Sequence, residues 1–97
     1  MCSDRLRGFQ TAGGDPFYAL GNPRRRAILR LLVSSPLSVR EIASELPVTR
    51  QAVARHLGFL AAAGLVAGCE VDGRRAWQLN EQGLGPVRNY LEILERG

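Results

Sequence analysis

Apolar positions follow helical spacing over most of this chain and alternate like a pair of strands near residue 70. The pattern predicts a short helical turn at 15–20, helices over about 23–34, 39–46, 50–63 and 80–95, and strands over 65–71 and 74–79. The first 14 residues are polar and glycine-rich and show no period. We therefore expect a flexible N-terminal tail at 1–14, followed by a single domain at 15–97.

Capping and breaking residues set the limits of the two central helices. Ser38 and Glu41 form a capping box, in which each side chain accepts a hydrogen bond from the other's free backbone N–H. Pro47 ends this helix, because a proline pushes the preceding residue out of the helical region. Thr49 is placed to cap the next helix, and Gly64 supplies the left-handed residue that stops it.

The hairpin is predicted by Asp72 and Gly73, which stand between two strand-like runs. Both central positions of such a turn require a positive φ, which Asp and Gly tolerate. Helix, tight turn, helix and hairpin follow one another as in a winged helix-turn-helix. The expected fold class is mostly α with a small β-hairpin: about five helices plus a two-stranded wing. Such a unit places one helix in a groove of DNA.

Charge supports a nucleic-acid partner. The net charge is +4, and all 13 basic residues are arginine. Residues 1–80 hold 11 arginines and 6 acidic residues, whereas residues 81–97 hold 2 and 3. The excess positive charge thus accompanies the helix-turn-helix, where arginine gives bidentate phosphate contacts and counterion release. The chain has no signal peptide and no apolar run long enough for a membrane, so we expect a cytoplasmic protein without a membrane partner.

The 50–63 helix divides into two faces. Val53, Leu57 and Leu60 share one face and are expected in the core. Gln and Arg on the opposite face can pair with adenine and guanine, and Ala54 and Gly58 are small enough for a close approach to the major groove. The predicted DNA-contacting residues are Thr49, Arg50, Gln51, Ala54, Arg55, His56, Arg74 and Arg75. The alternative for the helix residues is an ordinary solvated face.

Three further groups have two interpretations each. Arg74 and Arg75 would reach a phosphate or the minor groove, or they keep an exposed edge strand soluble. His56 lies at the border of the buried face and can donate to a phosphate or to a carbonyl of a neighbouring helix. Arg24 and Arg25, which we expect to face outward, and the adjacent Arg26 lie near a helix N-terminus, where the dipole disfavours a cation. They contact phosphate or form a solvated face.

Asn80 is placed to cap the last helix, but Gly83, Gly85 and Pro86 weaken its first turns, so a start nearer Gly85 is the alternative. This helix has two apolar strips. Leu84, Val87, Leu91 and Leu94 follow the seam spacing of a helix that packs on another helix, and Tyr90 and Ile93 form a strip beside it. Two strips need two partners, so we assign one to the domain's own core and one to a second subunit. A domain of this size gains stability from such pairing. The expected homodimer interface consists of Phe17, Tyr18, Leu84, Val87, Leu91 and Leu94.

Four stretches resemble the ArsR/SmtB family of bacterial winged-helix repressors. They are ALGNPRRRAIL at 19–29, LSVREIA at 37–43, AVARHL at 52–57 and AGLV at 63–66, joined by GRR at 73–75 in the wing. The resemblance covers about Asp15 to Leu94. It implies a homodimer that pairs through its first and last helices on a twofold-symmetric operator. It also implies repression of its own operon until an inducer binds, and the sequence does not identify that inducer.

The chain departs from the family at the sensing sites. Metal-responsive members carry Cys-x-Cys at the start of the helix before the recognition helix, and the matching positions here are Ser38 and Arg40. Other members use Asp and His on the last helix, which has no histidine here. Since a zinc site needs about four N or S ligands, we expect no metal site at these places and no cofactor.

Three other classes of function are alternatives to a DNA-binding regulator. The two cysteines, Cys2 and Cys69, do not make a disulfide framework, and a thiol-based metal or redox sensor that uses both is an alternative. A winged helix that binds another protein is a second, although arginines on the exposed faces favour DNA. An enzyme is excluded, because the chain has no nucleophile–base pair, phosphate loop or paired carboxylates.

Overall fold

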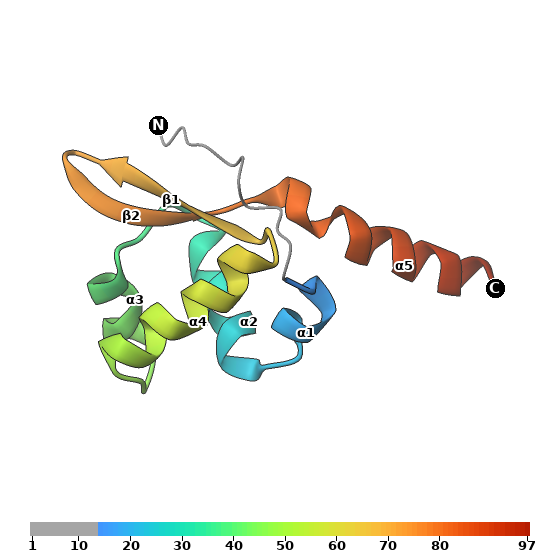
Figure 1. The fold of residues 1–97 in the computed structure, drawn as a ribbon, viewed down its shortest axis with the longest axis horizontal. Helices are drawn as coiled ribbons and strands as arrows, with labels where there is room; N and C mark the ends of the chain where they lie inside the picture. The colour runs from blue at the N-terminus through green and yellow to red at the C-terminus, as the bar shows by residue number, and fades with distance from the viewer. Residues whose placement is uncertain (1–13) are drawn as a thin grey trace.

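The computed structural model describes residues 14–97 and confirms the expected fold class (Figure 1). The described elements are α1 (Pro16–Leu20), α2 (Pro23–Leu32), α3 (Val39–Glu45), α4 (Arg50–Ala62), β1 (Val66–Val71), β2 (Arg74–Leu79), the 3₁₀ turn η1 (Glu81–Leu84) and α5 (Gly85–Arg96). The predicted helices at 23–34, 39–46 and 50–63 each extend one or two residues too far. Most of the predicted tail, including Cys2, lies outside the described residues.

The predicted caps of the two central helices are present. Glu41 N donates to Ser38 Oγ at 3.1 Å, and Ser38 N donates to Glu41 Oε1 at 2.8 Å, which completes the capping box of α3. Thr49 Oγ1 accepts from Ala52 N at 3.0 Å and begins α4. Gly64 ends that helix with a φ of +79°. Local chemistry therefore fixes the turn between α3 and α4 before any tertiary contact is considered.

The wing is an antiparallel pair of strands with the predicted turn. Asp72 and Gly73 both have positive φ, 53° and 79°, and Val71 pairs with Arg74 beside them. The pattern did not predict that the wing also binds the segment before α3. Leu37 and Trp77 exchange backbone hydrogen bonds of 3.0 and 2.8 Å, which attach β2 to the start of the helix-turn-helix.

The core lies between α2, α3, α4 and the base of the hairpin. Its largest fully buried side chains are Ile28, Ile42, Val53, Leu57, Leu60, Leu65 and Val66. The predicted core face of the recognition helix α4 is thus confirmed. Trp77 of β2 is half-buried and packs against this cluster.

The connection from the wing to α5 differs from the expectation. We expected the Asn80 side chain to cap the last helix, but its Nδ2 donates to the carbonyl of Gly64 at 2.8 Å. A Cβ at Gly83 would collide with the same Gly64 carbonyl, so only glycine fits there. The 3₁₀ turn is therefore pressed against the end of α4, and α5 begins at Gly85, which confirms the later of the two expected starts.

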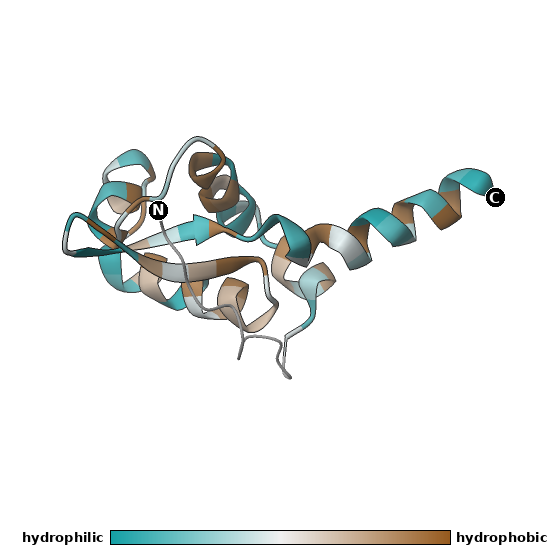
Figure 2. Cartoon of the chain, turned by 90° about the horizontal axis from the view of Figure 1, so that it is seen from above, coloured by the Kyte–Doolittle hydropathy of each residue, from teal (hydrophilic) through white to brown (hydrophobic). Residues whose placement is uncertain are grey.

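Helix α5 projects away from the rest of the domain, on the side opposite the wing tip (Figure 1). Apolar segments run along the helix (Figure 2), yet none of its residues is buried. Only its first half contacts the domain, where the Tyr90 ring meets the Phe17 ring edge-on at 5.3 Å. Leu91, Ile93 and Leu94 are each more than half exposed.

The capping box gives a direct stability test. Replacing Ser38 with alanine removes the Oγ that accepts from Glu41 N, so the Ser38→Ala variant should lose about 1 kcal/mol of unfolding free energy. Urea denaturation measures this loss. The matched control is Ser35→Ala, since Ser35 is exposed in the preceding loop. Equal unfolding midpoints for the two variants would contradict the assigned role of the cap.

Candidate nucleic-acid interface

Helix α4 has one buried face and one exposed face, as predicted. Arg50, Gln51, Ala54, Arg55 and Gly58 are all exposed, opposite the core side chains of the same helix. The exposed set combines hydrogen-bonding groups with two positions that carry little or no side chain. A helix with this surface can approach the edges of base pairs closely.

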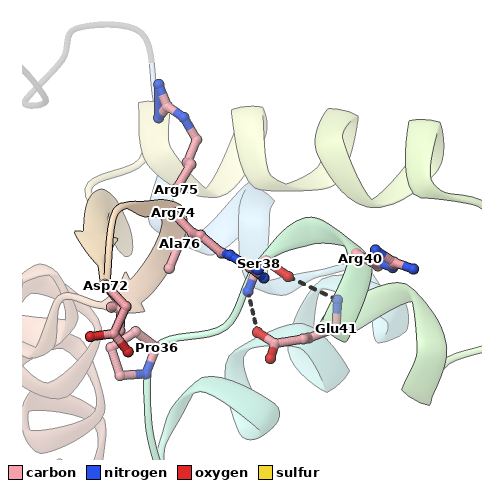
Figure 3. A pocket seen from close by; sticks show the side chains of 9 residues that line it. Pro36, Ser38, Arg40, Glu41, Asp72, Arg74, Arg75 and Ala76 are labelled. Atoms are coloured by element: carbon pink, nitrogen blue, oxygen red, sulfur yellow. Dashed lines mark hydrogen bonds between the residues drawn. The ribbon is translucent and has the colours of Figure 1, made fainter.

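A groove separates the wing from the beginning of α3 (Figure 3). It has a volume of about 610 Å³, and the residues that line it are Pro36, Ser38, Arg40, Glu41, Val71, Asp72, Arg74, Arg75 and Ala76. A second, more open hollow of about 390 Å³ lies between α3 and the start of α4, and Arg40 and Arg50 both line it. Because Arg40 borders both hollows, it connects the wing to the recognition helix.

Sequence reasoning missed Arg40 as a candidate and considered it only as a position without a cysteine. A signal was available, since Arg40 stands in the first turn of α3, where the helix dipole disfavours a cation. Arg40 is exposed there, so its guanidinium is accessible from both hollows.

The two wing arginines point in different directions (Figure 3). Successive side chains of a strand project to opposite faces. The Arg75 guanidinium carbon lies 6.0 Å from the centre of the Trp77 ring, so its side chain folds back along the wing. Arg74 extends toward the groove at Ser38 (Figure 3). The sequence pattern predicted the same role for the two residues, but although both line the groove, their side chains leave the wing in different directions.

The arginine run in the first turn of α2 corrects an expectation. Arg24, Arg25 and Arg26 each donate to a backbone carbonyl: to Pro47 O at 3.3 Å, Ala19 O at 2.9 Å and Leu20 O at 2.7 Å, respectively. Two of these carbonyls lie at the C-terminal end of α1, where a cation is favoured by the helix dipole. Arg25, expected to face outward, is only 5% exposed. The run binds the protein's own carbonyls, and this explains its place in the chain.

His56 is half-buried on α4, and its Nδ1 lies 3.5 Å from Arg25 Nη1. An arginine N–H can only donate, so Nδ1 is the acceptor and the neutral ring carries its proton on Nε2. Burial lowers the pKa of His56 below 6.5, and the nearby charges of Arg25, Arg55 and Arg24 lower it further. His56 is therefore neutral at physiological pH, with Nε2–H as its remaining donor.

The cysteines and acidic residues form no metal site in the part of the chain that the structure describes: no three His, Cys, Asp or Glu side chains are grouped to hold an ion. Cys69 lies on β1 opposite Ala76. Cys69 is not a free thiol. Among residues 14–97, no helix is long and apolar enough to cross a membrane.

The exposed recognition helix, the wing and the turn between α3 and α4 define a winged helix-turn-helix, and comparisons with known proteins agree. A family profile described as a helix-turn-helix domain matches residues 20–69. The HTH-type transcriptional regulator Rv2034 of Mycobacterium tuberculosis is 43% identical over 76 residues, which are 78% of this chain and 71% of that protein. The chain belongs to the ArsR-like family of helix-turn-helix transcriptional regulators.

Solved structures support the same assignment. An ArsR-like transcriptional regulator from Rhodococcus sp. RHA1 superposes with a TM-score of 0.76 at 34% identity, over 82% of this chain and 73% of that one. The DNA-binding domain Mb0332 of Mycobacterium bovis, described as a homodimeric winged helix-turn-helix, has a TM-score of 0.65 at 22% identity, over 82% and 74% of the two chains. At that identity, Mb0332 supports the fold alone.

The state of His56 makes stability depend on pH. Because the folded protein lowers the pKa of His56 from 6.5, the unfolded chain binds the proton more readily, and stability falls as pH drops through this value. Urea denaturation at about pH 7.5 and about pH 5.5 measures the loss. A His56→Asn variant, which keeps an acceptor near Arg25, should lose less stability than the wild type over this interval. Equal losses of stability in the wild type and the His56→Asn variant would contradict the lowered pKa of His56.

Proposed function

We propose that this protein is a homodimeric, sequence-specific repressor of its own operon that is released by a signal yet to be identified. The observation that carries the proposal is the exposed face of α4, with Gln51, Ala54 and Arg55 at its centre. This face is flanked by arginines of the groove, which belong to α3 and β2, and by Arg50 at the start of α4 itself. A base-contacting centre with a cationic border is the arrangement that duplex DNA requires.

The exposed side chains divide into two roles. Gln51 and Arg55 contact base edges in the major groove, and Ala54 and Gly58 leave room for the helix to enter it. Phosphate contacts come from Arg50 and the other residues around this centre, and they orient the protein without selecting sequence. These surrounding residues are Thr49, Arg40, His56, Arg74 and Arg75.

The dimer interface lies on α1 and α5. Leu91 and Leu94 are more than half exposed, as is Ile93 of the second strip, and they form an apolar surface beside Phe17 and Tyr18. The first residue of the expected seam, Leu84, packs against the domain's own core instead. Val87 is half-buried between the two regions. The Mb0332 domain, which has the same fold, is itself a homodimer.

Twofold pairing through these helices presents two recognition helices to one side of a duplex. Successive major grooves on that side are about 34 Å apart, and the operator is expected to have matching half-sites. Autorepression follows if such a sequence occurs upstream of the protein's own gene. Selection of duplexes from a randomised pool identifies the preferred sequence, and its position in the genome then tests this part of the proposal.

Base-contacting and phosphate-contacting arginines should differ in binding assays. Arg55→Ala should lose about 1–3 kcal/mol on the preferred duplex and little on a scrambled one, because bidentate base contacts are specific. Arg74→Ala should weaken binding to both duplexes and reduce the salt slope by about 1. Fluorescence anisotropy over a salt series measures both quantities. Arg30→Ala, an exposed arginine of α2, is the matched control.

Two results would overturn the DNA assignment. Equal affinity of the wild type for preferred and scrambled duplexes would remove sequence specificity. Equal losses on both duplexes for Arg55→Ala would remove the base-contacting role of that residue, even if binding remained.

The interface gives a separate test. Leu91→Glu places a charge in the apolar surface of α5, so the variant should be monomeric in sedimentation analysis and should bind the preferred duplex at least tenfold more weakly, since about half of the contacts are lost. Asn89→Glu adds the same group on the opposite side of α5 and is expected to remain dimeric. A dimeric Leu91→Glu variant would place the interface elsewhere.

A further inference from the structure

Arg25 is the most unusual charged residue of the domain, since its side chain is buried and its contacts join three helices. It belongs to α2, and its Nε donates to Ala19 O at 2.9 Å and its Nη2 to Tyr18 O at 3.4 Å, both on α1. Its Nη1 reaches His56 of α4 at 3.5 Å. The guanidinium carbon also lies 5.2 Å from the Tyr18 ring centre and 4.9 Å from that of Phe59.

These contacting groups are all uncharged. Two are carbonyls, two are aromatic ring faces, and one is the acceptor nitrogen of a neutral imidazole. A buried guanidinium needs most of its N–H groups satisfied in a fixed plane. The planar fork therefore holds its partners in one relative arrangement, which a flexible apolar side chain would not impose.

The partners belong to the two functional surfaces. Tyr18 is 62% exposed on the α1 side of the proposed dimer interface. His56 and Phe59 are on the recognition helix, and the Phe59 ring also meets the Tyr18 ring edge-on at 6.1 Å. Arg25 thus lies at the junction between the helix that pairs the subunits and the helix that contacts DNA.

We propose that Arg25 is a positioning residue for sequence recognition, which fixes the angle of α4 relative to the dimer helix α1. The inference rests on the proposed function. Base contacts are short and directional, so they require both recognition helices of the dimer to enter their grooves at the correct angle. Attraction between exposed arginines and phosphates acts over a longer range and tolerates a change of angle. Loss of Arg25 therefore lowers specificity and leaves general DNA affinity in place.

The test compares affinity for the preferred duplex, selected from a randomised pool by the wild type, with affinity for a scrambled duplex. Arg25→Met keeps a long apolar side chain and loses the hydrogen bonds. It should reduce the ratio of the two affinities about tenfold or more, with scrambled binding within about twofold of the wild type. Arg25→Lys retains a cation between the rings and should recover part of the ratio. Circular dichroism and sedimentation check that each variant is folded and dimeric.

Arg26→Met is the matched control, because Arg26 is an adjacent arginine whose guanidinium donates to Leu20 of α1 and is exposed. Its affinity ratio should equal that of the wild type. A folded, dimeric Arg25→Met variant with an unchanged ratio would overturn the positioning role and leave the proposed function intact. A wild type that does not discriminate between the duplexes would overturn the proposed function itself.

If Arg25→Met does not fold, a second variant tests the positioning role of Arg25. Phe59→Leu removes one ring from the guanidinium and keeps the arginine with its hydrogen bonds to α1. Phe59 is 40% exposed and is not assigned to the DNA surface. A folded Phe59→Leu variant should show a ratio reduced several-fold, and an unchanged ratio would count against the proposal.

Discussion

The packing of α4 is the constraint on which the rest of the structure depends. Val53, Leu57 and Leu60 have no exposed surface and form the centre of the core. Because helical spacing places Gln51, Ala54 and Arg55 on the other side, the same packing determines which residues α4 exposes. The core therefore orients the recognition helix as well as stabilising the domain. A change in the volume of these side chains would move the exposed face of α4 and lower stability together.

Features governed by neighbouring residues could be predicted from the sequence. The Ser38–Glu41 capping box, the Thr49 cap and the Asp72-Gly73 turn each depend on groups within three or four positions along the chain, and the structure contains all three. The exposed face of α4 could be predicted for a similar reason, since it follows from helix geometry and three apolar residues. Together these signals were sufficient for the fold class and the recognition helix.

Features that depend on distant partners could not be predicted. Asn80 is a good capping residue by type, but its side chain binds a carbonyl 16 positions earlier. Arg25 has the same local sequence character as its two neighbours, and only the meeting of α1, α2 and α4 makes it buried. Arg74 and Arg75 are adjacent and chemically identical, and both line the groove, but the wing places the Arg75 guanidinium near the Trp77 ring. In each case the sequence gives the chemical type of the side chain, but it does not indicate which helix or strand that side chain contacts.

The close fit of Gly83 against Gly64 connects the wing side of the molecule to the end of the recognition helix. Helix α5 starts two residues later, so its direction is set from the very point where α4 ends. In a dimer paired through α5, the direction of α5 relative to α4 sets the distance between the two recognition helices, and so the spacing of the DNA half-sites. Relatives that replace either glycine with a larger residue would then recognise half-sites of similar sequence but different spacing, and operator preference could diverge without any change in the residues that touch DNA.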